Sequence, residues 1–429
     1  SSSGTAASSS SGGGPFPRVD GVLRCGDVPV EELARRFGTP LYVYDLAAIR
    51  ARLDLFHAAF AGIDHLVAYS VKANGNLTLL RALAEAGCGA DVTSGGELYR
   101  SRTAGIAPDR IVFAGVGKTE EEIRYALDED ILAFNVESRP ELERIDRVAE
   151  ELGRQARFGV RVNPDVFAET PHAYTRTGHA ETKFGVPWTE AADLYRWAAG
   201  RDALRPVGID VHIGSQIVEP EPYVRAIERV LDLVSELEDD GIGLEYLDIG
   251  GGYGISYDDR PGMDIDALAR DVVPRVEASG LRLLMEPGRS LVGEAGILLS
   301  RVQYVKRTEA KTFVILDGGM SELIRPSHYG GYHEVELVAD PAGRPSGTVD
   351  VVGPICETGD FLALDRDMPM PEPGDLVAVR TAGAYGFVMA SNYNGRRRPA
   401  EVVVDGDGIH LARRRETFED LIRGEEASA

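Results

Sequence analysis

Between His65 and Arg289 the sequence alternates short β-branched runs with longer amphipathic stretches, and this alternation limits the possible fold more than any other feature. Such a rhythm is typical of successive strand–helix units around a parallel sheet. Eight strand-like runs occur, at 65–72, 89–93, 110–114, 131–136, 157–163, 207–214, 244–251 and 281–287. Helix-like stretches lie between them, at 77–86, 120–127, 140–152, 223–237 and 265–278. Eight strands with intervening helices predict a (β/α)8 barrel of the TIM type.

After about residue 290 the pattern changes to short alternating runs separated by Pro, Gly and Asp, which predicts a β-barrel or β-sandwich. A strand-like run at 41–44, before the barrel, indicates that the β domain draws from both ends of the chain. We therefore expect a flexible low-complexity tail at 1–14 and an N-terminal segment at 15–45 that contributes to the β domain. The barrel then spans 46–289, and the C-terminal β domain spans 290–429.

Composition narrows the possible partners. The formal net charge of −23 opposes binding to a phosphate backbone, so we do not expect nucleic acid to be a partner. Cys25, Cys88 and Cys356 are odd in number and far apart, which predicts neither a disulfide framework nor a metal site and favours the cytoplasm. No apolar run approaches the roughly 18 residues of a membrane helix, so we expect a soluble protein with no membrane partner.

Polar residues gather where the predicted barrel strands end, and in such barrels the active site is built from the loops at those ends. The residues in these positions are Lys72, Asp91, Arg161, His212, Ser215 and Glu286. A lysine after a strand is most often a solvated loop charge. Held at the end of a buried strand beside polar groups, however, its amine is placed to lose a proton and form a Schiff base.

Glycines follow the seventh predicted strand, at Gly250, Gly251 and Gly252. Backbone amides in such a run can approach a phosphate closely, although a glycine run by itself is more often a tight turn. The Gly-x-Gly-x-x-Gly pattern of dinucleotide sites fails because Ile255 occupies the third glycine position. Arg289, which follows the eighth strand, could add positive charge beside a phosphate at this end of the barrel.

Three further residues have both a structural and a chemical interpretation. Glu286 could form a local salt bridge in a solvated turn, or it could keep a pyridinium nitrogen protonated. His212 could be a satisfied structural histidine, or it could stack on a flat cofactor at the barrel mouth. Cys356 could be an inert buried thiol, but the turn formers and the acid around it also permit an exposed proton donor.

Seven motifs follow one another along the chain. They are Ser70-Val-Lys-Ala-Asn74, Gly89-Ala-Asp-Val-Thr-Ser-Gly-Gly-Glu97, His212-Ile-Gly-Ser215, Gly250-Gly-Gly252, Glu286-Pro-Gly-Arg289, Cys356-Glu357 and Gly383-Ala-Tyr-Gly386. Taken together, these motifs resemble those of the pyridoxal-phosphate-dependent decarboxylases with the alanine-racemase fold, and within that group those of the diaminopimelate decarboxylases. The resemblance runs from about residue 21 to about residue 421.

The resemblance implies a homodimer that binds pyridoxal 5′-phosphate at shared active sites. Lys72 would hold the cofactor covalently, Glu286 would pair with its pyridine nitrogen, and His212 would stack on its ring. Cys356 would come from the partner subunit and return a proton to the carbanion. The other residues expected around the cofactor are Asp91, Ser215, Gly250, Gly251, Gly252, Gly288, Arg289 and Tyr385.

By the same resemblance, the enzyme would decarboxylate meso-2,6-diaminopimelate to L-lysine and CO2, the last step of lysine biosynthesis. Arg325 and Tyr329 would hold the distal carboxylate, Glu357 would accept the distal ammonium group, and Arg289 and Tyr385 would lie nearby. Two arginines disfavour ornithine, which lacks a second carboxylate. A related decarboxylase of ornithine, arginine or a carrier-linked aminoacyl group and a non-catalytic regulatory homologue remain alternatives. Residues 170–184 would form a loop that can cover the site and alter its specificity.

Overall fold

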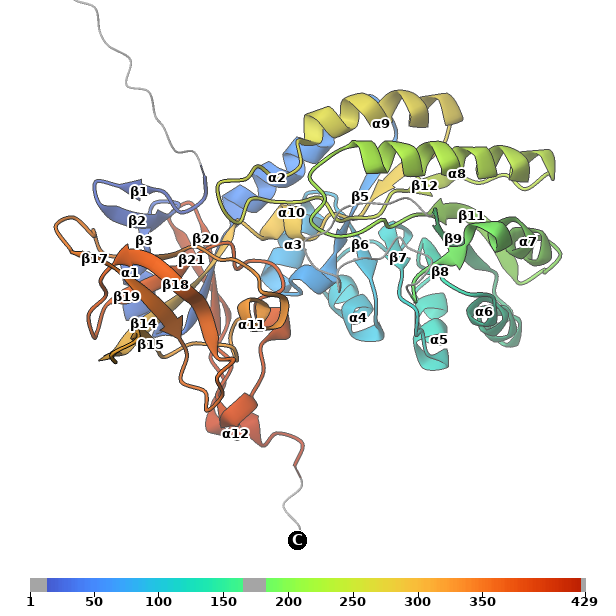
Figure 1. Cartoon of the computed structure of the whole chain (residues 1–429). Helices are drawn as coiled ribbons and strands as arrows, with labels where there is room; N and C mark the ends of the chain where they lie inside the picture. The colour runs from blue at the N-terminus through green and yellow to red at the C-terminus, as the bar shows by residue number, and fades with distance from the viewer. Residues whose placement is uncertain (1–13, 165–182, 426–429) are drawn as a thin grey trace, which may run out of the picture.

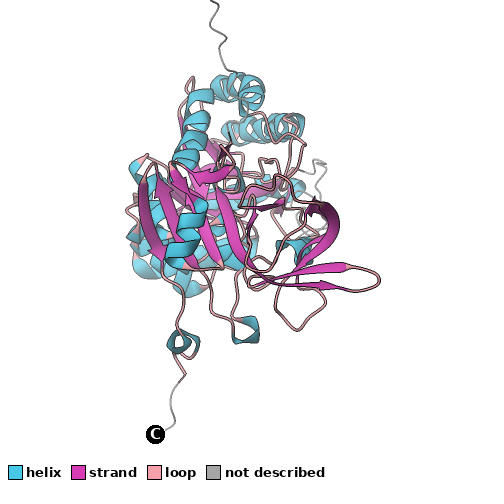
Figure 2. Cartoon of the chain, turned by 90° about the vertical axis from the view of Figure 1, so that its left-hand side faces the viewer, coloured by secondary structure: helices cyan, strands magenta, loops and turns pink. Residues whose placement is uncertain are grey.

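The computed structural model describes residues 14–164 and 183–425. A strand barrel surrounded by helices lies beside a mostly β domain, and the two views in Figures 1 and 2 show the helices gathered around the barrel. The predictions for residues 1–13 of the tail and for most of the loop at 170–184 concern residues outside the described ranges. Within those ranges, no helix is long and apolar enough to cross a membrane.

The barrel is a closed ring of eight parallel strands, as the alternation of strands and helices predicts. Each strand pairs with the next one in the chain, and β13 returns to pair with β5. A short extra strand, β10 (Val186–Pro187), adds to the edge of β9. The eight strands are β5 (His65–Ser70), β6 (Gly89–Val92), β7 (Ile111–Phe113), β8 (Ala133–Val136), β9 (Ala156–Asn163), β11 (Leu204–Asp210), β12 (Tyr246–Asp248) and β13 (Arg282–Met285).

Several of the helices begin soon after a strand because a polar residue ends the apolar run and caps the first turn of the helix. The side chains of Asn76, Ser94, Thr119 and Ser138 each accept a hydrogen bond from a backbone amide in the first turn. The helices around the ring are α2 (Leu46–Ala59), α3 (Leu77–Glu85), α4 (Gly95–Thr103), α5 (Glu120–Asp128), α6 (Arg139–Leu152), α7 (Trp188–Ala199), α8 (Glu221–Asp239) and α9 (Ile265–Ser279).

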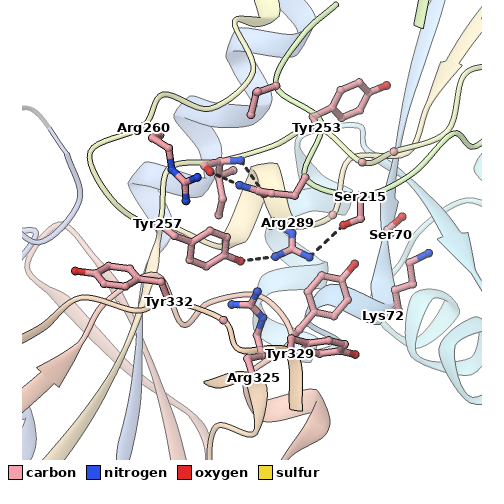
Figure 3. A pocket seen from close by; sticks show the side chains of 18 of the residues that line it. Ser70, Lys72, Ser215, Tyr253, Tyr257, Arg260, Arg289, Arg325, Tyr329 and Tyr332 are labelled. Carbon is pink, nitrogen blue, oxygen red and sulfur yellow. Dashed lines mark hydrogen bonds between the residues drawn. The ribbon is translucent and has the colours of Figure 1, made fainter. Parts of the chain in front are cut away.

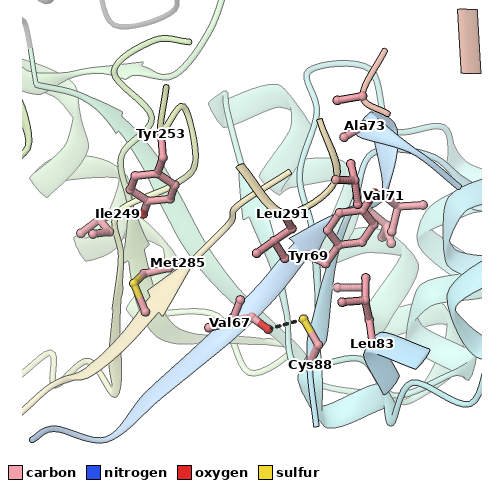
Figure 4. Packing of buried hydrophobic residues seen from close by; sticks show 14 of the residues in the cluster. Val67, Tyr69, Val71, Ala73, Leu83, Cys88, Ile249, Tyr253, Met285 and Leu291 are labelled. Carbon is pink, nitrogen blue, oxygen red and sulfur yellow. Dashed lines mark hydrogen bonds between the residues drawn. The ribbon is translucent and has the colours of Figure 1, made fainter. Parts of the chain in front are cut away.

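The barrel core is apolar where the strands meet these helices. Figure 4 shows Val67 and Tyr69 of β5 among apolar side chains that include Leu83 of α3 and Met285 of β13. The thiol of Cys88 donates a hydrogen bond to the carbonyl oxygen of Val67 at 3.1 Å. This packing fixes β5, whose end carries the residues of the site.

The β domain is built around β14 (Gly296–Arg307), which pairs with three different strands along its length. One of them is β4 (Leu41–Asp45), so the predicted strand before the barrel belongs to this sheet. The other strands of the domain are β15 (Thr312–Leu316), β16 (Val335–Leu337), β17 (Ser346–Val352), β18 (Phe361–Pro369), β19 (Leu376–Val379), β20 (Ala400–Asp405) and β21 (Gly408–Arg413). A small separate sheet contains β1 (Arg18–Val19), β2 (Val22–Cys25) and β3 (Val28–Pro29), and it precedes α1 (Val30–Phe37).

The two domains are joined by hydrogen bonds beside the end of β5. The side-chain amide of Asn74 donates to the carbonyl oxygen of Gly383 at 3.0 Å, and the backbone amide of Tyr385 donates to the carbonyl oxygen of Ala73 at 2.9 Å. Tyr385 has a φ of 54°, a left-handed conformation that a non-glycine residue rarely adopts. The guanidinium group of Arg289 lies over the Tyr385 ring, 4.9 Å from its centroid, and Tyr385 is near enough to Lys72 to raise the pKa of its amine.

Candidate active site

A cavity of about 960 Å³ lies at the C-terminal ends of the barrel strands and extends to the β domain. Figure 3 shows Lys72 and Ser215 on one side of it and Arg325 and Tyr329 on another. The predicted site residues that line it are Lys72, His212, Ser215, Gly251, Gly252, Glu286, Gly288, Arg289, Arg325, Tyr329 and Tyr385. Asp91 is buried behind this surface, and Gly250 is not among the lining residues.

Lys72 lies in a single 3-10 turn, Val71–Ala73, directly after β5. Its side chain is surrounded by protein but reaches solvent through the cavity. The hydroxyl of Ser70 lies 2.7 Å from Oδ2 of Asp91 and 3.1 Å from the carbonyl oxygen of Glu286, which fixes the end of the strand. Burial lowers the pKa of the Lys72 amine, but Asp91, Tyr385 and Glu286 together outweigh it and leave this pKa raised.

Three carboxyl groups, those of Glu286, Asp248 and Asp210, lie within 4.8 Å of one another beneath the cavity. Burial is the main cause that raises the pKa of all three, and it raises that of Asp248 to about 6. The neighbouring Asp248 further raises the pKa of Glu286. Glu286 is only 5% exposed, and its Oε1 has no hydrogen-bond partner in the described part of the chain. It is therefore an acid ready to give a proton to a base placed beside it.

His212 and the glycines at 250–252 lie next to Glu286. Burial, followed by the charges of Arg161 and Lys72, holds the pKa of His212 well below its ordinary value, so the imidazole is neutral. Its Nδ1 accepts a hydrogen bond from the backbone amide of Gly251 at 3.2 Å. A Cβ on Gly251 would overlap the carbonyl oxygen of Glu286, and one on Gly252 would overlap that of Gly214. Only glycine permits this close approach.

Arg289 and Arg325 place two positive charges in the same cavity. Arg289, at the start of α10 (Arg289–Val292), donates a hydrogen bond to the hydroxyl of Ser215 at 3.2 Å. Arg325, the first residue of α11 (Arg325–Tyr329), is 7% exposed. Within the described residues, neither guanidinium group takes part in an ion pair. The cavity therefore favours an anionic occupant on this side.

Cys356 and Glu357 lie elsewhere, on an exposed loop between β17 and β18. Neither residue lines the cavity of its own chain. The chain thus brings together the residues expected to hold a cofactor and an anionic group, but not the thiol expected to donate a proton.

Sequence reasoning missed several contacts within this site. Tyr257 and His333 contact the two arginines, and Asp248 lies under Glu286. Tyr257 follows the glycine run in an irregular loop, where no periodicity marks an inward-facing residue. His333 stands in the segment 324–334, which also supplies Arg325 and Tyr329, and its burial could not be predicted from the residue pattern of that segment.

A pyridine ring that carries an aldehyde and a phosphate fits the residues present. The unpartnered Oε1 of Glu286 offers a partner for a ring nitrogen, and Lys72 offers an amine for the aldehyde. Gly251 and Gly252 line the same cavity with backbone alone, since a Cβ on either would overlap a neighbouring carbonyl oxygen. These groups lie on the same cavity, as a single ligand requires.

The barrel, Lys72 and the buried Glu286 define a class of enzyme, and comparison with known proteins indicates the same class. Residues 46–293 match the family described as "Pyridoxal-dependent decarboxylase, pyridoxal binding domain", so the chain is a pyridoxal-phosphate-dependent decarboxylase. It is 50% identical to the diaminopimelate decarboxylase of Pseudomonas aeruginosa over 411 residues, which cover 96% of this chain and 98% of that protein. The chain belongs to the diaminopimelate decarboxylase family.

Two solved structures share the fold over nearly the whole chain. The diaminopimelate decarboxylase of Helicobacter pylori complexed with L-lysine has a TM-score of 0.88 and 41% identity, and the match covers 92% of this chain and 98% of that one. That of M. jannaschii in co-complex with L-lysine has a TM-score of 0.91 and 37% identity, with coverage of 96% and 98%. The prediction of family and fold from the motifs is confirmed.

Proposed function

We propose that the chain decarboxylates meso-2,6-diaminopimelate, using pyridoxal 5′-phosphate, and releases L-lysine and CO2. The observation that carries this proposal is the position of two guanidinium groups without a carboxylate partner, among the described residues, in the cavity that Lys72 also lines. The substrate has one carboxylate to lose and a second, distal one to be held. Relatives that act on this substrate support the same assignment.

Lys72, Glu286 and His212 would hold the cofactor. Lys72 would bind it through the amine, Glu286, whose pKa is raised, would keep a proton at the pyridine nitrogen, and the neutral His212 would contact the ring. Ser215, Gly251, Gly252 and Gly288 would surround its phosphate, and Gly250 would shape the same turn from behind the cavity surface. Asp91 accepts a hydrogen bond from the hydroxyl of Ser70 and so orients the turn that carries Lys72. When bound, the cofactor supplies an electron sink for the pair of electrons that the departing carboxylate leaves behind.

The remaining residues would bind the substrate and move a proton. Arg325 and Tyr329 would hold the distal carboxylate, and Arg289 and Tyr385 line the cavity nearby. As the bond between the reacting carbon and its carboxylate breaks, CO2 leaves. The thiol of Cys356 then gives its proton to that carbon. The carboxylate of Glu357 accepts hydrogen bonds from the distal ammonium group of the substrate. Each site would thus release one CO2 and one L-lysine.

We infer a homodimer in which each cavity receives Cys356 and Glu357 from the other subunit. Both residues are exposed and lie outside the cavity of their own chain, which supports this arrangement. We also propose domain boundaries at 15–45, 46–289 and 290–429, and a cytoplasmic location. Three free cysteines among the described residues support a reducing compartment.

An assay of CO2 release tests this function. The holoenzyme is given meso-diaminopimelate, ornithine or arginine in parallel, and lysine formation is followed for the first. We expect a preference for meso-diaminopimelate of at least about 100-fold in kcat/KM, because ornithine leaves the arginines unpaired in a desolvated site. A preference for ornithine or arginine would assign the enzyme to the other decarboxylase class. No CO2 from any of them would favour a regulatory homologue.

A further inference from the structure

The guanidinium groups of Arg289 and Arg325 both contact Tyr257, a residue of the loop after β12. Arg289 donates a hydrogen bond from Nη1 to the Tyr257 hydroxyl at 2.5 Å. Arg325 lies over the face of the same ring, 4.6 Å from its centroid. Figure 3 shows Tyr257 with its hydroxyl directed at Arg289 and with Arg325 on another side of the ring. One neutral side chain thus contacts both positive charges.

His333 holds Arg325 from the other side. Its Nε2 lies 2.8 Å from Nη1 of Arg325, and its Nδ1 lies 2.8 Å from the carbonyl oxygen of Arg380. Because a guanidinium group only donates hydrogen bonds, Nε2 must accept, and Nδ1 must carry the hydrogen that reaches Arg380. Burial and the charge of Arg325 lower the pKa of His333 to about 3, which keeps this tautomer neutral. The imidazole and the Tyr257 ring also pack nearly perpendicular to each other, with centroids 5.5 Å apart.

A neutral hydrogen-bond partner affects the charge of an arginine differently from a carboxylate partner. An acidic partner would fix each arginine but would also cancel its charge. A phenol and an unprotonated imidazole fix the direction of the guanidinium groups and leave both charges for a ligand. Arg289 and Tyr257 belong to the barrel, whereas Arg325 and His333 belong to the β domain. The contacts therefore also set the distance between charges carried by two domains.

We propose that Tyr257 and His333 are positioning residues that hold Arg289 and Arg325 without neutralising them, and that this arrangement selects substrates with a second carboxylate. The inference rests on the proposed function and deepens it. It assigns part of the substrate specificity to Tyr257 and His333, which act on the substrate only by positioning Arg289 and Arg325.

Binding of two matched ligands to the full-length holoenzyme tests the proposal. L-Lysine keeps the distal carboxylate of the substrate, whereas cadaverine has the same chain and amines without it. Calorimetry measures both dissociation constants for the parent and for Tyr257→Phe, His333→Leu and His333→Gln. Glutamine offers Arg325 an amide oxygen and can donate an N–H to the Arg380 carbonyl, so it serves as the conservative replacement. Tyr304→Phe removes the same hydroxyl from an exposed tyrosine of β14 and is the control.

We expect Tyr257→Phe and His333→Leu to raise the Kd of L-lysine about 10-fold, because the first removes an acceptor from the partly buried Arg289 and the second an acceptor from the buried Arg325. The Kd of cadaverine should stay within about twofold, and His333→Gln should recover most of the lost lysine affinity. Equal weakening of both ligands, or unchanged lysine binding, would overturn the proposal. If His333→Leu does not fold, the Kd values of L-lysine and cadaverine for Tyr257→Phe decide alone, because that substitution removes only one oxygen atom.

The same experiment separates this inference from the proposed function. Binding of L-lysine and cadaverine does not require turnover. A parent enzyme that binds L-lysine better than cadaverine, but releases no CO2 from meso-diaminopimelate, would reject the function and leave the role of the two residues standing. A parent that decarboxylates meso-diaminopimelate, with variants that weaken both ligands alike, would reject the inference alone.

Discussion

Replacing Glu286 with glutamine should remove the proton that the electron sink needs while it preserves the shape of the site. The carboxyl group is 5% exposed and has a raised pKa because of burial and Asp248. At a contact distance of about 3 Å and an effective dielectric constant of about 20, a carboxylate and a pyridinium attract each other by about 5.5 kcal/mol. Desolvation of the pair offsets roughly half of this attraction. The remaining ~3 kcal/mol corresponds to a loss of roughly 100-fold in kcat.

The assay is lysine formation at saturating meso-diaminopimelate, with the visible spectrum recorded to show that the cofactor is bound. KM should change little, because Glu286 does not contact the distal carboxylate in this account. Glu294→Gln is the matched control, since Glu294 is a partly buried acid with a raised pKa that does not line the cavity. A Glu286→Gln enzyme with bound cofactor and a kcat within about threefold of the parent would refute the reasoning.

Three further predictions follow from the site. Gly251→Ala should abolish cofactor binding in a folded protein, because its Cβ would overlap the Glu286 carbonyl oxygen; a normal cofactor content measured by absorbance would contradict this. Removal of the cofactor should lower Tm more at about pH 8 than at about pH 5.5. Burial raises the pKa of Asp248 above its value in the unfolded chain. The protein without cofactor therefore loses stability as the pH rises through about 6, because this buried carboxyl group then ionises. The positive charge of a bound pyridinium ring would oppose this loss. A Tm difference that does not depend on pH would argue against the acid cluster. Finally, Lys72→Ala and Cys356→Ser should each be nearly inactive, yet their coexpression should restore about a quarter of the parent activity, since half the dimers would hold one intact site. No recovery would exclude a shared site.

The barrel was predictable from sequence because each of its strands is an apolar run that ends in polar or glycine residues. The ends of individual strands were less predictable where the chain leaves the sheet before the apolar run is over. The run at 207–214 continues the β-like pattern, but β11 begins at Leu204 and ends at Asp210, so that His212 turns into the cavity. α4 has few apolar positions, and only Leu98 and Ser101 are buried, so periodicity does not reveal it.

The residues at strand ends were predictable for the same topological reason, because parallel strands deliver their C-terminal ends to one face. Tyr257 and His333 were not, since their role depends on contact with arginines from separate segments. Asp248 likewise became meaningful only when the closed barrel placed it under Glu286. Sequence patterns identify groups that face the site, whereas the groups that orient them depend on tertiary packing.

The visible spectrum of the purified protein after addition of pyridoxal phosphate shows most directly whether Lys72 holds the cofactor. We expect an absorbance band that borohydride abolishes and that Lys72→Ala lacks, because the amine of Lys72 holds the cofactor. Peptide mapping of the reduced protein should place the cofactor on Lys72. A protein without such a band, or one whose Lys72→Ala variant keeps it, would contradict the central claim.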